Sequence, residues 1–188
     1  SKEDITTPAE TDADEEEQAK KKLTEDTTAK HHDEVKKLKP DEVIDRAYDN
    51  AKKLDEESKQ MEQESILLTD IVNNQRTEAN EKAKEAESAL ILSQSTPDEP
   101  TKIRESDKAK SLKEESDKMF NDATFLSSLS DTLYKQSVRT KQQAQQASEI
   151  AKKIESVVQS GNATHHIYDM LYEQETQLNV KPTPPGEP

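Results

Sequence analysis

The chain has 188 residues, of which 36% are charged and only 29% hydrophobic, and its 27 basic residues face 41 acidic ones. Globular domains usually contain about 45–50% apolar residues, so this composition argues against a thick core. Two glycines and 3% aromatic residues disfavour a sheet fold, while the lack of cysteine excludes disulfides and thiolate metal sites. The net charge of −14 argues against nucleic acid and anionic membrane surfaces as partners.

The N-terminal part of the chain predicts a flexible start and one helix. Residues 1–10 read as an extended segment. Residues 11–38 carry a sparse apolar stripe at Ala19, Leu23, Val35 and Leu38, which is typical of a solvated helix. Because the chain begins at Ser1 and shows no signal peptide, we expect a mature or trimmed form.

A long helix is predicted over residues 41–94. Pro40 followed by two acids suits a helix start, because acids complement the positive end of the helix dipole. Pro97 and Pro100 lie in the segment 94–101, which we expect to break the helix. Steps of three and four residues connect a continuous stripe: Ala47, Ala51, Leu54, Ser58, Met61, Ser65, Leu68, Val72, Gln75, Ala79, Ala83, Ala86 and Leu90.

A second long helix is predicted over residues 102–160, with Gly161 as its end. Its apolar stripe contains no charged residue, although charged residues occur between the stripe positions throughout. This pattern indicates a heptad seam rather than disorder. The stripe comprises Ala109, Leu112, Ser116, Met119, Ala123, Leu126, Ser130, Leu133, Ser137, Thr140, Ala144, Ala147, Ala151, Ile154 and Val158.

The C-terminal part predicts a short amphipathic helix and a linker. Ile167, Leu171, Gln174 and Leu178 recur at helical spacing within residues 163–179. Residues 181–188 are proline-rich and read as a linker.

These elements predict an all-α fold, with one elongated helical bundle over residues 11–180. A short connection between two long helices favours an antiparallel hairpin. With the tip near Pro97, facing residues have numbers that add up to about 195. The shorter N- and C-terminal helices then pack at the other end and make a three- or four-helix bundle.

One zone of the hairpin also carries apolar residues outside the seam. We name Ile66, Leu67, Ile71, Phe120 and Phe125 as an interaction surface or core belt. A helix that is apolar on several faces needs more than one neighbour. We favour cover by an outer helix of the same chain over cover by a second molecule.

No catalytic site, cofactor or metal site is predicted. Paired carboxylates such as Glu56-Glu57 and Glu114-Glu115 fall off the seam, whereas acid-base catalysis needs carboxylates held in a desolvated cleft. Phosphate-binding loops, serine nucleophile motifs and di-metal Glu-x-x-His motifs are all missing from the sequence. We therefore expect a protein that is not an enzyme.

The four histidines form two adjacent pairs, His31-His32 and His165-His166, both close to predicted turns at the same end of the hairpin. Two readings are open. One histidine from each pair could meet its counterpart and respond to acid pH. The favoured reading is that all four are exposed histidines near helix ends.

Asn162-Ala163-Thr164 is an N-glycosylation sequon in a turn marked by Gly161, which makes Asn162 the predicted glycosylation site. The chain contains 25 Glu and 16 Ala, no cysteine, a long hairpin, and a proline-rich tail from Lys181 to Pro188. In these features it resembles the glutamic acid/alanine-rich, GPI-anchored surface proteins of insect-stage African trypanosomes.

The resemblance implies a coat protein on the extracellular cell surface of a parasite in its tsetse vector, held to the membrane by a GPI anchor that this segment lacks. It also implies lateral packing with copies of itself. Two alternatives stay open. One is an adhesin or interaction module that binds an unknown partner protein through the hairpin. The other is an intracellular coiled-coil scaffold, for which the sequon is accidental.

Overall fold

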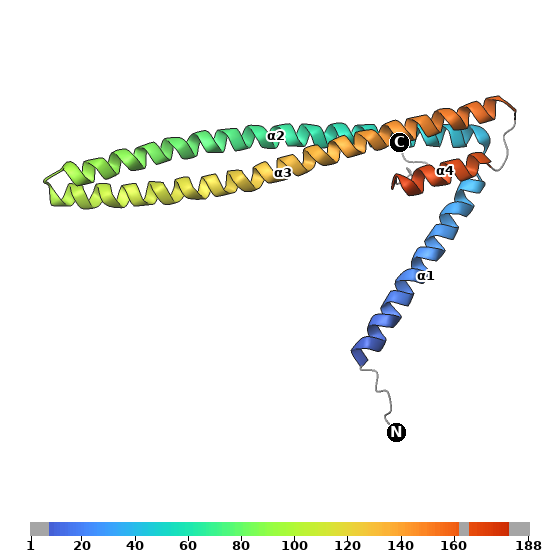
Figure 1. Cartoon of the computed structure of the whole chain (residues 1–188), viewed down its shortest axis with the longest axis horizontal. Coiled ribbons are helices and arrows are strands. Elements are labelled where there is room, and N and C mark those ends of the chain that lie inside the picture. Colours follow the sequence, from blue (N-terminus) through green and yellow to red (C-terminus); the bar gives the residue numbers. More distant parts are fainter. Residues whose placement is uncertain (1–7, 162–165, 181–188) are drawn as a thin grey trace, which may run out of the picture. The chain divides into compact units, whose positions relative to one another are not determined.

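The structure, a computed structural model, describes residues 8–161 and 166–180, with side chains from residue 12 onward. It contains four helices and, in these residues, no strand: α1 (Pro8–Lys36), α2 (Pro40–Ser95), α3 (Glu99–Gln159) and α4 (His166–Gln177) (Figure 1). The prediction of an all-α fold with two long paired helices and two shorter ones is confirmed. Asn162, His165 and the tail 181–188 lie outside the described residues.

Prolines occupy the first turns of three helices, where they are tolerated because the backbone N–H groups there have no helical partner. Pro8 and Pro40 begin α1 and α2. Pro100 lies inside the first turn of α3, so the break between the long helices is shorter than predicted. Asp98 caps this helix, because the Thr101 backbone N–H donates to its carboxylate at 3.2 Å.

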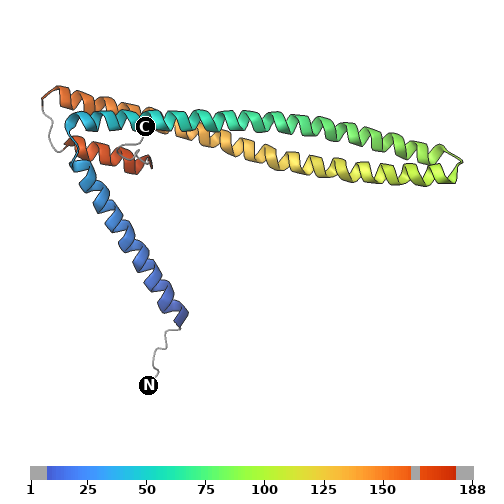
Figure 2. The same ribbon diagram turned by 180° about the vertical axis from the view of Figure 1, so that it is seen from behind.

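The chain divides into two compact units. Unit 1 comprises residues 1–53 and 143–188, and unit 2 comprises residues 54–142. Each long helix contributes one stretch to each unit (Figure 2).

Unit 1 holds the most completely buried core. Its members come from all four helices: Val35, Val43, Ala47, Ala151, Ile154, Ile167 and Leu171. The Tyr168 hydroxyl donates to the Leu38 carbonyl at 2.7 Å, which fastens α4 to the turn between α1 and α2. Gly161 follows α3 with a φ of 76°, a left-handed conformation that glycine adopts without strain.

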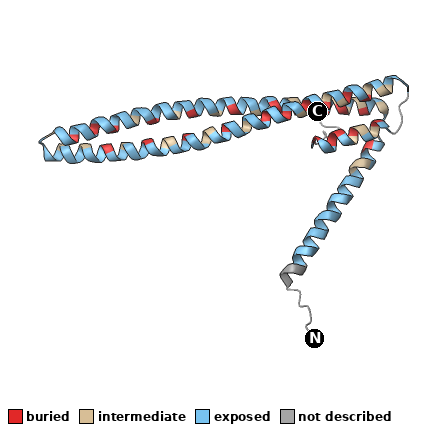
Figure 3. Ribbon diagram, in the orientation of Figure 1, coloured by how far each residue is buried: buried red, intermediate tan, exposed pale blue. Residues whose placement is uncertain are grey.

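Unit 2 is an antiparallel pair made of residues 54–95 of α2 and 99–142 of α3. At 1.5 Å per residue, the stretch of α2 in this pair spans about 60 Å. Buried residues lie along the line where the two helices face each other, and the outer faces are exposed (Figure 3). The unit is therefore two helices thick.

Serine side chains join the two helices of unit 2 directly. The Ser58 hydroxyl donates to the Ser137 carbonyl at 2.9 Å, and the Ser116 hydroxyl donates to the Ala79 carbonyl at 2.8 Å. A short side chain reaches the facing backbone only when the helices pack closely, as small seam residues allow. The residue numbers in each pair add up to 195, so the predicted register is confirmed.

The seam differs from the prediction near the turn. Ala83 and Leu90 are exposed, whereas Ala89 and Ser93 are buried and Lys82 is half-buried. Val72, Ala79, Ala86 and Ser93 keep a seven-residue spacing, so the heptad runs through Lys82 rather than Ala83. Lys82 is accommodated because its ammonium group reaches Glu115 at 3.0 Å while its stem covers the seam.

Candidate functional site

The carboxylate of Glu175, on α4 in unit 1, is completely buried. Arg46 of α2 binds it with two hydrogen bonds, from Nε to Oε2 at 2.7 Å and from Nη2 to Oε1 at 2.6 Å. Asn50, one helical turn further along α2, donates to Oε2 at 2.7 Å. Both carboxylate oxygens are thus held by α2 in a bidentate arrangement that is typical of strong charge-assisted contacts.

Gln174, the neighbour of Glu175, joins three helices. Its Nε2 donates to the Ala47 carbonyl of α2 at 3.1 Å and to the Ala147 carbonyl of α3 at 2.9 Å. Its Oε1 accepts a hydrogen bond from Asn50 Nδ2 at 2.9 Å. The amide is fully buried and every one of these groups has a partner, so the polar cluster is satisfied inside an apolar core.

Helix α1 reaches this cluster through its two histidines. His31 Nε2 lies 2.7 Å from Glu175 Oε1, and His32 Nε2 lies 3.6 Å from Asp169 Oδ1. The Tyr172 ring packs near both histidines, with its centroid 5.0 Å from that of His31 and 4.9 Å from that of His32. We call Glu175, Arg46, Asn50, Gln174 and His31 the Glu175 cluster.

Burial by itself would raise the pKa of Glu175, but hydrogen bonds from Arg46, His31 and Asn50 outweigh it and hold the pKa below its ordinary value. The group therefore stays ionised at neutral pH. A general acid must instead hold a proton at its working pH. The Glu175 cluster has the electrostatics of a structural tie between helices.

A hollow of about 350 Å³ opens beside the cluster in unit 1. It is lined by Thr27, Thr28, His31, Tyr172, Glu175, Thr176, Asn179 and Val180. The hydroxyl groups of Thr27, Thr28 and Thr176 already donate to backbone carbonyls of their own helices. These donors are therefore turned to the helix backbone rather than offered to a ligand.

The sequence placed the histidines correctly near a helix end but not their surroundings. His31 and His32 are half-buried against carboxylates, so the favoured reading of exposed histidines is wrong for this pair. His166 is exposed, and its neighbour His165 lies outside the described residues. Gln174 is buried, as the stripe of α4 predicted, but the sequence did not single out the buried Glu175 beside it.

The predicted belt lies in unit 2, where the two paired helices leave most of it exposed. Ile66, Leu67, Ile71 and Phe125 are exposed, with Phe125 the most exposed at 71%, and Phe120 is half-buried. Within the pair, Ser65, Val72 and Ala123 occupy the buried seam, and the belt side chains lie beside it. Cover of the belt by an outer helix of unit 1 stays a prediction.

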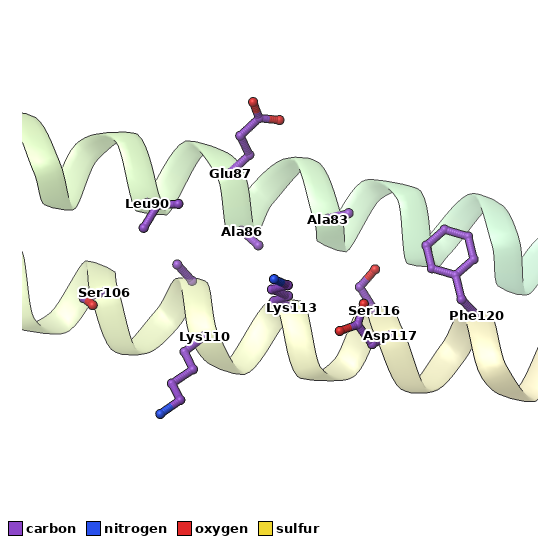
Figure 4. A pocket seen from close by; sticks show the side chains of 11 residues that line it. Ala83, Ala86, Glu87, Leu90, Ser106, Lys110, Lys113, Ser116, Asp117 and Phe120 are labelled. Atoms are coloured by element: carbon purple, nitrogen blue, oxygen red, sulfur yellow. The ribbon is translucent and has the colours of Figure 1, made fainter.

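Phe120 belongs to a separate hollow of about 540 Å³ on unit 2. Figure 4 shows Ala83 and Ala86 of α2 above Ser116 of α3, with Phe120 closing one end and Leu90 near the other. Lys110 and Glu87 point away from the space between the helices. The hollow follows from the small side chains that line the pair at this level.

No cluster of three or more histidine, aspartate or glutamate side chains suited to a metal ion occurs in the described part of the chain. The described helices also include none with an apolar stretch long enough to cross a bilayer. Comparisons with protein-family models, with curated proteins and with solved structures find no match.

Proposed function

We propose that this chain is a non-enzymatic structural protein of a cell surface, in which the antiparallel helix pair acts as a spacer. One observation carries the proposal. Throughout unit 2 the two helices pair in a single register, fastened by Ser58, Ser65 and Ser116 to the facing backbone. Such a pair resists bending, because each layer would have to break cross-helix contacts to open.

The charge distribution supports the same role. In unit 2 no charged residue is among the buried ones, so its acidic and basic side chains lie outside the core of the seam. The chain as a whole carries a net charge of −14. Like-charged neighbours repel one another at short range, which keeps crowded copies soluble and separate. Repulsion of this kind suits a protein that is present at high density.

The finer proposal is a GPI-anchored coat protein of an insect-stage trypanosome, glycosylated at Asn162. Its support is the resemblance in Glu and Ala content, in the sequon and in the proline-rich tail. The paired helices suit this role, since a coat acts through shape, charge and glycans rather than through a catalytic cleft.

Two experiments on cells that express the complete gene test the proposal. A GPI-specific phospholipase should release the native protein into the medium, and Asn162→Gln should increase its electrophoretic mobility by the mass of one glycan. The matched control is Asn121→Gln, which changes an exposed asparagine outside any sequon. Antibody staining only after permeabilisation, with no release, would contradict the surface location and favour an intracellular scaffold.

A second candidate function is an interaction module, and the exposed side chains of Leu67, Ile71 and Phe125 favour it. Contiguous exposed apolar side chains on a soluble protein often mark a site of protein contact. The two functions are compatible, because a spacer can also present a binding surface along its length.

A further inference from the structure

We propose that one flank of unit 2 binds a basic amphipathic helix of another protein. This docking surface consists of Leu67 and Ile71 on α2 with Phe125 and Leu129 on α3, and we call it the apolar patch. The inference deepens the second candidate function and rests on it.

Helix geometry places the members of each pair together. Leu67 and Ile71 are four residues apart on α2, and Phe125 and Leu129 are four residues apart on α3, so each pair occupies one face of its helix. Ile71 directly precedes the buried Val72, and Leu129 directly precedes the buried Ser130. Both pairs therefore hold equivalent positions beside the seam.

The register brings the two pairs to the same level. Ser65 contacts Ser130, so facing residues have numbers that add up to 195. In this register Leu67 and Ile71 on α2 face the stretch of α3 that carries Phe125 and Leu129. An antiparallel helix pair has an approximate two-fold axis perpendicular to the plane that contains the two helices. Rotation about this axis exchanges the two helices, and a residue on one flank of the first helix is carried to the same flank of the second. Equivalent positions thus share a flank, and the four side chains form one patch.

The patch is exposed. The exposed fractions are 62% for Leu67, 45% for Ile71, 71% for Phe125 and 41% for Leu129. Ile66 is also exposed but lies about 100° around α2 from Leu67, so it belongs to the other flank. A third helix laid along this flank would bury the patch between three helices, with Phe125 as the aromatic anchor.

The charges around the patch select the partner. Glu64, Glu78 and Asp122 are exposed on this flank within seven residues of the patch, and Lys118 is the basic residue of the flank within that distance. A second copy of the chain would bring the same acids and its own charge of −14 against them. A helix with Lys or Arg beside its apolar stripe complements the rim instead.

Binding of synthetic helices to the full chain tests this surface. One probe is a peptide of about 20 residues, long enough to form a helix, with a leucine stripe flanked by lysines. The second probe has the same stripe flanked by glutamates. We expect the lysine peptide to bind at least about tenfold more tightly than the glutamate peptide at moderate ionic strength, as measured by fluorescence anisotropy.

The variant Leu67→Ser/Phe125→Ser should weaken binding of the lysine peptide by about tenfold or more. The control Ile103→Ser removes another exposed apolar side chain of unit 2 and should leave binding within about twofold. Because all three side chains are exposed, circular dichroism and the urea midpoint should stay unchanged in both variants. A third variant, Glu64→Gln/Asp122→Gln, should weaken the lysine peptide alone.

The possible results distinguish the basic partner, the binding surface and a second copy of the chain. Equal loss for both peptides in the patch variant would overturn the basic partner and keep the interaction function. Binding that is insensitive to the patch variant would overturn the surface itself. Concentration-dependent dimerisation, abolished by Leu67→Ser/Phe125→Ser in sedimentation experiments, would assign the patch to a second copy and overturn the proposal. None of these results affects the phospholipase test of the spacer.

Discussion

Ser65 and Ser130 exchange hydrogen bonds across the helix pair. The Ser65 hydroxyl donates to the Ser130 carbonyl at 3.0 Å, and the Ser130 hydroxyl donates to the Ser65 carbonyl at 2.8 Å. Each helix thus binds the backbone of the other through its shortest polar side chain. Reciprocal contact of this kind requires the two backbones to approach closely at this layer.

Substitution at Ser65 should depend on size more than on polarity. Ser65→Ala removes one hydrogen bond but fits the same space, so the free energy of unfolding should fall by no more than about 1 kcal/mol. Ser65→Leu should lower it by about 1–3 kcal/mol, because the larger side chain forces the helices apart. Urea denaturation measures both, and a more stable Leu variant would show that the layer is not tightly packed.

Removal of one partner of the Glu175 cluster should be strongly destabilising. Glu175→Gln leaves the Arg46 guanidinium without its counter-charge, at a cost of about 3–5 kcal/mol to the unfolding free energy. The exposed Glu173→Gln on the same helix is the matched control and should change little. Glu175→Leu/Arg46→Met should cost less than the sum of the single changes, and additive losses would argue against coupling between the two.

The stabilising effect of Glu175 should depend on pH in a defined direction. Its pKa is below the ordinary value of 4.5 in the folded protein, so the folded state binds fewer protons there than the unfolded state. Stability from this group is therefore complete above the ordinary pKa and is lost as the pH falls through the lowered folded pKa. The stability difference between the native protein and Glu175→Gln should therefore be constant above the ordinary pKa of 4.5 and should shrink as the pH falls below it. A difference that grows on acidification would contradict the assignment.

Gln75 offers a gain of stability. Its Oε1 is buried without a hydrogen-bond partner in the described structure, at a seam position of α2. Gln75→Leu should raise the free energy of unfolding by about 1 kcal/mol, since it removes the unsatisfied group and fills the seam with apolar atoms. The exposed Gln63→Leu should be neutral. A loss of stability in the first variant would indicate that the amide has a partner in solution.

The periodic parts of the fold were predictable from the sequence. The positions of Ser58, Ser116 and Ser130 followed from a repeat of seven residues, and the register followed from the position of Pro97 alone. Near the turn, the repeat alone did not predict which residues occupy the seam. The stem of Lys82 made a charged residue acceptable in the seam, which shifted the stripe away from Ala83.

The Glu175 cluster was not predictable, because it joins residues that are about 130 positions apart and belongs to no repeat. A glutamate in a chain with 25 glutamates carries no signal of its own. For Phe125 the sequence left an exposed interaction surface and a buried core belt both open. Periodicity shows which residues avoid the seam, but only the packing of the helices shows whether anything covers them.

The repeat of small residues along unit 2 has a consequence for alignment. Layers such as Ser58–Ser137 and Ser65–Ser130 are chemically alike, so a slip of one heptad would place serine near serine again. The seam alone therefore distinguishes poorly between alignments. Only residues 96–98 separate α2 from α3, and a connection this short leaves no slack for a slip of about 10 Å. The short turn, with Asp98 as the helix cap, thus fixes the register of the two helices along the whole pair.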